Sequence, residues 1–154
     1  MKRLFFPLLL IIILSCQSNS INKKNQVKEE VSQKKTFLKL EKERYNVAFL
    51  IMDGTFNTEL TAPFDIFQHT IFRKNIKAMN VFTVANTDQA ITTFEGMRIM
   101  PDYNYLKDSL PKIDIFVVPS AEHHLNSDLE DIAMIDFVKQ VDKEATYVTS
   151  HCDG

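Results

Sequence analysis

The side chain best suited to covalent chemistry in this sequence is the thiol of Cys152. It follows residues 145–149 (ATYVT), which are typical of a short strand, and it precedes Asp153-Gly154. A thiol at a sharp turn from a strand into a helix lies at the helix N-terminus, where unpaired N–H groups and the helix dipole stabilise the thiolate. We therefore expect Cys152 to be a reactive nucleophile. The alternative is a buried cysteine that serves only as a small apolar side chain.

A second polar segment follows another apolar run, at residues 119–124 (PSAEHH). Ser120 and His123 are candidate pocket residues in this segment, as is His151 beside the cysteine. Side chains that flank a residue in a tight turn point away from it, so we expect His151 to line a pocket rather than to act as the base. The alternative for the histidine pair is a simple polar loop. No spacing of ligands matches a metal site, and we expect neither a metal nor another cofactor.

These residues would be positioned by strands that alternate with helices. Apolar runs predict strands at residues 45–52, 113–118 and 145–149, and alternating apolar and polar residues predict another at residues 79–85. Residues 91–94 and 97–100 are expected to form a hairpin. Helical spacing predicts helices over residues 59–72, with Pro63 in the first turn, and over residues 128–141, with Ser127 as the N-cap. This order predicts a parallel sheet covered on both faces, with the functional site at the carboxyl ends of the strands.

The first 16 residues have the form of an export signal. Lys2 and Arg3 precede an apolar run over residues 4–14, which is shorter than the ~20 residues that span a bilayer. Residues 13–16 (ILSC) resemble the bacterial lipobox, in which the cysteine carries the lipid. We expect lipidation at Cys16 and a lipid-anchored protein of the bacterial cell envelope, in the periplasm or at the outer membrane. The alternatives are an ordinary secretory signal and a short core helix.

Charge divides the rest of the 154-residue chain. Residues 17–44 carry eight Lys/Arg and four Asp/Glu with few apolar side chains, which predicts a polar flexible tether. Residues 45–154 carry eight Lys/Arg and sixteen Asp/Glu together with all the later apolar runs, which predicts the folded domain. The basic segment lacks interleaved aromatic residues, so we expect no nucleic-acid partner. Two cysteines exclude a scaffold stapled by several disulfides.

Three segments, in this order, resemble the PfpI family, also called the DJ-one family. They are residues 59–63 (ELTAP) at a helix start, residues 114–121 (DIFVVPSA) at a strand and its following loop, and residues 147–154 (YVTSHCDG) at a nucleophile elbow. The resemblance covers residues 45–154 and implies the flavodoxin-like α/β sandwich of class I glutamine amidotransferases, with a mostly parallel central sheet. Because the family continues well beyond its cysteine, we expect a partial domain that is incomplete at the C-terminus.

The resemblance also implies roles for individual residues. Cys152 would be the catalytic nucleophile, and Glu59 would be a protonated carboxylic acid that donates a hydrogen bond to its sulfur. The backbone amides of Ala121 and Asp153 would form an oxyanion hole. Two positions differ from the family pattern, since Ser120-Ala121 replaces a glycine pair and Asp153 stands where protease-like members have a histidine.

Several functions are open to such a domain. The resemblance implies a cysteine-dependent hydrolase, amidase, hydratase or deglycase-like activity on a small electrophile. The alternatives are a non-enzymatic ligand or redox sensor that uses Cys152, and a degenerate structural domain. A small-molecule substrate or ligand and a membrane lipid anchor are the expected partners. The family is commonly dimeric, which implies a homodimer.

Overall fold

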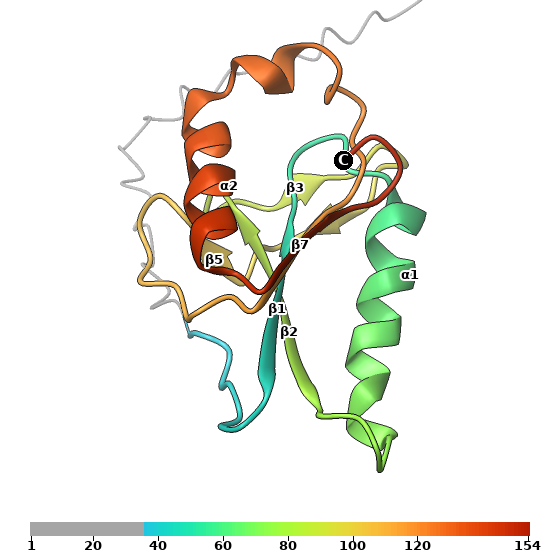
Figure 1. The fold of residues 1–154 in the computed structure, drawn as a ribbon. Coiled ribbons are helices and arrows are strands. Elements are labelled where there is room, and N and C mark those ends of the chain that lie inside the picture. Colours follow the sequence, from blue (N-terminus) through green and yellow to red (C-terminus); the bar gives the residue numbers. More distant parts are fainter. Residues whose placement is uncertain (1–35) are drawn as a thin grey trace, which may run out of the picture. The chain divides into compact units, whose positions relative to one another are not determined.

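The computed structural model describes residues 36–154, in which two α-helices pack on opposite faces of a parallel sheet (Figure 1). The strands of the sheet lie in the order β5-β2-β1-β6-β7, and each pairs in parallel with its neighbours. They are β1 (Tyr45–Leu50), β2 (Met79–Ala85), β5 (Tyr103–Asn104), β6 (Ile115–Val118) and β7 (Tyr147–Ser150). The predicted α/β fold with a mostly parallel central sheet is confirmed. The predicted export signal and lipidation site lie outside the described residues.

The two helices cover two separate apolar clusters. Ala48 of β1 packs in the cluster beneath α2 (Ile132–Glu144), whereas its neighbour Phe49 packs in the cluster beneath α1 (Asn57–Gln68). Successive side chains of a strand point to opposite faces, so a strand covered on both sides needs a continuous apolar run. The largest side chains of this core are 0% exposed, and each contributes roughly 2–3 kcal/mol: Phe49, Phe82 and Phe116.

Helix α1 begins at Asn57, two residues before the predicted start. Phe56 precedes the helix and has no side chain that can cap it, but the Oε2 atom of Glu95 accepts a hydrogen bond from the Asn57 N–H at 3.0 Å. The earlier start moves Pro63 from the predicted first turn into the second turn. Because proline has no N–H, the carbonyl of Glu59 receives no hydrogen bond from within the helix. A 3₁₀ turn, η1 (His69–Phe72), completes the predicted helical segment.

Helix α2 begins later than predicted, and Ser127 is not its N-cap. A separate 3₁₀ turn, η2 (Ser127–Glu130), comes first, and the N–H of Ser127 is bound by the side chain of Asn126. The N-cap of α2 is Asp131, whose Oδ1 atom accepts a hydrogen bond from the Met134 N–H at 3.0 Å. A carboxylate also interacts favourably with the positive end of the helix dipole, which explains why Asp131 starts the regular helix.

The remaining elements lie around the edges of the sheet. The predicted hairpin is present as an antiparallel pair, β3 (Ile91–Thr92) and β4 (Arg98–Ile99), outside the main sheet. The two-residue edge strand β5 was not predicted, because it is too short to show a periodic pattern. Before β1, Phe37 stacks on Tyr103 of β5 with 5.4 Å between the ring centroids. None of the helices within residues 36–154 combines the length and apolarity needed to cross a bilayer.

Candidate functional site

The strand order reverses between β1 and β6. From β1 the chain passes through α1 to β2 on one side, and it later returns to β6 on the other side. Such a topological switch point is where open α/β sheets bind ligands. The loops that follow β1 and β6 therefore form the candidate site.

The two loops are held together by backbone hydrogen bonds. The N–H of Phe56 donates to the carbonyl of Ser120 at 3.1 Å, and the N–H of Glu122 donates to the carbonyl of Gly54 at 3.0 Å. Between these bonds, Thr55 forms an isolated antiparallel bridge with Ala121. The loop after β6 is thereby fixed against the start of α1.

Glu59 lies in the first turn of α1 and forms an ion pair with His151, which follows β7. The Glu59 side chain is 21% exposed and that of His151 is 53% exposed. Apart from this ion pair, the buried Oε2 atom of Glu59 has no hydrogen-bond partner. The predicted hydrogen bond from Glu59 to the sulfur of Cys152 is not among the hydrogen bonds of residues 36–154. The carboxyl group of Glu59 instead contacts His151, which is 92 positions away in the sequence.

Cys152 follows β7 in a sharp turn. Its φ angle is +58°, in the left-handed region that non-glycine residues rarely adopt, and its side chain is exposed. The N–H of His151 donates to the carbonyl of Val118 at 3.1 Å, which continues the pairing of β6 with β7. Strained backbone of this kind is concentrated at functional sites, and here it presents the thiol at the carboxyl edge of the sheet.

The two backbone amides expected to form an oxyanion hole have no acceptor among the hydrogen bonds of residues 36–154. Ala121 is buried, and its carbonyl accepts a hydrogen bond from the His124 N–H at 3.3 Å, but its own N–H is not used. The N–H of Asp153 is likewise not used, whereas that of Gly154 donates to the His151 carbonyl at 3.2 Å. Both amides are therefore available as donors.

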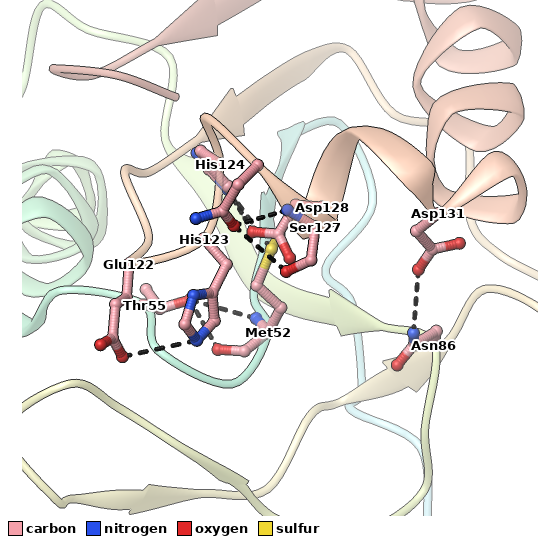
Figure 2. Close-up of polar contacts among 10 residues, drawn as sticks. Met52, Thr55, Asn86, Glu122, His123, His124, Ser127, Asp128 and Asp131 are labelled. Carbon is pink, nitrogen blue, oxygen red and sulfur yellow. Dashed lines mark hydrogen bonds and ion pairs between the residues drawn. The ribbon is translucent and has the colours of Figure 1, made fainter.

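The two adjacent histidines occupy different environments, as Figure 2 shows. The side chain of His123 is about half exposed, and its Nε2 atom lies 3.6 Å from Oε2 of Glu122. His124 is buried, with its Nε2 atom 3.3 Å from the sulfur of Met52 and 3.8 Å from Oδ2 of Asp128. A simple polar loop was one prediction for this pair, but His124 is buried and packs against Met52 at the end of β1.

A cavity of about 290 Å³ lies beside His123 at the ends of β1 and β2. The polar side chains that line it, several of which the sequence analysis missed, are Asp53, Asn86, Thr87, Tyr105, His123, Asp128 and Asp131. The Nδ2 atom of Asn86 lies 3.4 Å from Oδ2 of Asp131 across it (Figure 2). Burial, and to a lesser degree the charge of Asp131, raise the pKa of Tyr105 well above its ordinary value, so this phenol stays protonated at neutral pH.

A larger groove of about 460 Å³ lies between α2 and the edge strand β7. Its lining is mostly apolar and reaches the segment around the cysteine through Ser150, Asp153 and Gly154. In the part of the chain that the structure describes, no group of three or more His, Cys, Asp or Glu side chains is arranged to hold a metal ion.

The sequence profile of the DJ-1/PfpI family matches residues 45–154. Among solved structures, the fold is similar to that of a ThiJ/PfpI family protein from Pseudomonas syringae, with a TM-score of 0.57 and 20% identity over 72% of this chain and 43% of that one. It is also similar to Drosophila melanogaster DJ-1beta, with a TM-score of 0.56 and 14% identity over 71% of this chain and 55% of that one. This chain thus spans about half the length of these structures. A search of curated proteins gave no significant match.

Proposed function

Because this chain belongs to the DJ-1/PfpI family, we propose that Cys152 acts as a nucleophile on a small electrophile bound at the switch point between β1 and β6. The family includes cysteine-dependent hydrolases and deglycases. The observation that carries the proposal is the left-handed, exposed Cys152, one residue beyond a histidine that contacts Glu59. A cysteine that served only as an apolar side chain would be buried instead.

The proposed reaction uses groups from the first turn of α1 and from the segments that follow β6 and β7. The Cys152 thiolate forms a bond to an electrophilic carbon, and the electron pair of the C=O double bond moves onto its oxygen. The unused N–H groups of Ala121 and Asp153 then donate hydrogen bonds to this negative oxygen. Glu59, held in place by His151, exchanges the proton that the leaving group needs. An amide or a glyoxal-type carbonyl is the class of substrate that this chemistry fits.

Two variants test the proposal. We expect wild-type protein to be acylated by 4-nitrophenyl acetate and alkylated by iodoacetamide at Cys152, and we expect C152S to lose both reactions. The E59Q variant keeps the size of the side chain but cannot ionise, so it should retain the thiol and change the pH dependence of acylation. If wild-type Cys152 reacts no faster than a free cysteine in the unfolded protein, the proposal is wrong.

Reversible oxidation of Cys152 is the second candidate function, and the exposure of the thiol favours it. Peroxide oxidises an accessible thiolate to sulfenic acid, which thiols reduce again, whereas further oxidation to sulfinic acid is not reversed by thiols. Mass spectrometry after titration with peroxide would separate the two functions. A sensor would be oxidised at a low peroxide concentration and would not hydrolyse 4-nitrophenyl acetate repeatedly. A hydrolase would hydrolyse this ester over many turnovers.

We also propose that the domain is anchored to the bacterial cell envelope by a lipid on Cys16. The support is the order of a basic start, a short apolar run over residues 4–14 and the lipobox-like residues 13–16. Metabolic labelling with an alkyne fatty acid should mark the wild-type protein and not C16A. Equal labelling of both proteins would overturn the proposal.

A further inference from the structure

We propose that the hydroxyl group of Ser120 donates a hydrogen bond to the substrate oxygen, beside the N–H of Ala121. The proposal rests on the function proposed above and adds a side-chain donor to an oxyanion hole that otherwise consists of backbone amides. It concerns Ser120 in the loop after β6, at a position where the resemblance described above implies a glycine.

The first observation is that Ser120 is 1% exposed and that its Oγ atom has no hydrogen-bond partner. The buried threonines within residues 36–154 differ in this respect, because every one of their hydroxyl groups has a partner in the protein: Thr55, Thr70, Thr83 and Thr93. Burying a hydroxyl without a partner is unfavourable, so an unpartnered one needs an explanation. A hydrogen bond to a ligand provides it.

The second observation is the position of Ser120 relative to Cys152. Strands β6 and β7 are parallel, and Val118 of β6 pairs with Ser150 of β7. Ser120 and Cys152 each follow these paired residues by two positions, at the same carboxyl edge of the sheet. The hydrogen bond from the His151 N–H to the Val118 carbonyl shows that the two chains stay together beyond the last strand pair.

The third observation is that the nearby protein groups do not use the Ser120 hydroxyl. The carbonyl of Ser120 is bound by the Phe56 N–H, which places the residue at the start of α1. There, Oδ1 of Asn57 is also buried without a hydrogen bond, and Oε2 of Glu59 contacts only His151. Acceptors are thus present on the same helix, and the hydroxyl is bonded to neither of them. Its proton remains available for an acceptor that the substrate brings.

In the reaction, Ser120 stabilises charge and transfers no proton. The sulfur of Cys152 bonds to the carbonyl carbon of the substrate, and the π electron pair moves to the oxygen. This oxygen then accepts hydrogen bonds from the Ser120 hydroxyl and from the backbone amides. When the oxyanion collapses, the electron pair returns and the leaving group departs, while the hydroxyl keeps its proton.

The test compares two reactions of the same thiol. Acylation by 4-nitrophenyl acetate passes through an oxyanion, whereas alkylation by iodoacetamide is a direct displacement at carbon and forms none. We expect S120A to slow acylation of Cys152 by about tenfold or more, because one donor to the oxyanion is lost. We expect its alkylation rate to remain that of the wild type and its melting temperature to be unchanged or slightly higher, because a buried hydroxyl without a partner costs stability.

Thr70→Val is the matched control, because it removes a buried hydroxyl that donates to the Phe67 carbonyl at 2.6 Å. Thr70 lies in η1, beyond the C-terminal end of α1 and away from the site. It should lower the melting temperature and leave the ratio of acylation to alkylation unchanged. Equal acylation by S120A and wild type would overturn the role of Ser120 while the proposed function stands. A parallel loss of acylation, alkylation and stability in S120A would also overturn it, since it indicates a structural role. If C152S is acylated as fast as wild type, the proposed function fails and the role of Ser120 fails with it.

Discussion

Replacing Gly54 with alanine should destabilise the domain and disturb the loop that carries the proposed oxyanion hole. Gly54 has a φ angle of +83°, where an L side chain costs about 1–2 kcal/mol. A Cβ atom placed there would also lie 3.1 Å from the Cβ atom of Glu122, which belongs to the loop after β6. Neither atom is the end of a flexible side chain, so the backbone of one loop must shift. We expect about 2–3 kcal/mol in total, the larger part from the backbone conformation.

Gly96 provides a matched control for this prediction. Its φ angle is +88°, so G96A has a similar backbone cost, but a Cβ atom there would meet nothing within 4 Å. The difference between G54A and G96A in the free energy of unfolding therefore isolates the contact with Glu122. It should be about 1 kcal/mol, the lower end of the usual cost of overpacking. Urea denaturation at 25 °C followed by circular dichroism measures both variants.

A double variant and an activity measurement make the test sharper. Glu122→Gly removes the Cβ atom that Gly54→Ala would meet, so E122G should reduce the extra cost of G54A and not that of G96A. Because the Gly54 carbonyl binds the Glu122 N–H at 3.0 Å, G54A should also slow acylation of Cys152 more than G96A does. If G54A and G96A are equally destabilised, the proposed contact between the two loops is wrong.

Three further predictions concern groups outside the reacting centre. Burial alone would raise the pKa of Asp114, but the hydrogen bond from the Asn46 N–H at 2.9 Å and nearby lysines hold it below its ordinary value. The ionised carboxylate therefore stabilises the fold at pH values above the pKa of Asp114 in the unfolded chain. This stabilisation is lost as the pH falls through the lower pKa of the folded state. The free energy of unfolding of D114N should therefore depend less on pH than that of the wild type between about pH 5 and 2. The E95A variant should lose about 1 kcal/mol of stability, measured in urea, because Glu95 caps the first turn of α1; an unchanged midpoint would show that the cap is not formed in solution. Tyr105 should ionise only well above the ordinary tyrosine range in an absorbance titration, and D131N should lower its pKa only slightly, because burial is the larger cause of the shift.

Most of the fold could be predicted from the sequence because its central strands are covered on both faces. Residues 45–52 are a nearly continuous apolar run, and only a strand buried on both sides needs such a run at this length. Residues 79–85 alternate between apolar and polar side chains, which also predicts a strand. The helix boundaries were less predictable. The cap of α1 comes from Glu95, 38 residues away. Ser127 begins the 3₁₀ turn η2, whereas the side chain of Asp131 accepts the hydrogen bond that caps α2.

The residue types of the candidate site, but not its arrangement, could also be predicted. Cys152, Glu59 and His151 were singled out because thiol, carboxyl and imidazole groups follow predicted strands or begin a predicted helix. That Glu59 contacts His151, and that His124 is buried against Met52, depends on how β6 and β7 are placed beside β1. No local pattern encodes this placement.

The sequence by itself therefore determined the alternation of strands and helices, the two-sided burial of the sheet and the kinds of chemical group near its carboxyl edge. These follow from the periodicity of apolar residues, which is a local property of the chain. The tertiary structure decided which groups meet, which backbone amides stay unused and which hydroxyl is buried without a partner. Those features arise when loops far apart in sequence are brought together at the switch point, as the bridge between Thr55 and Ala121 illustrates.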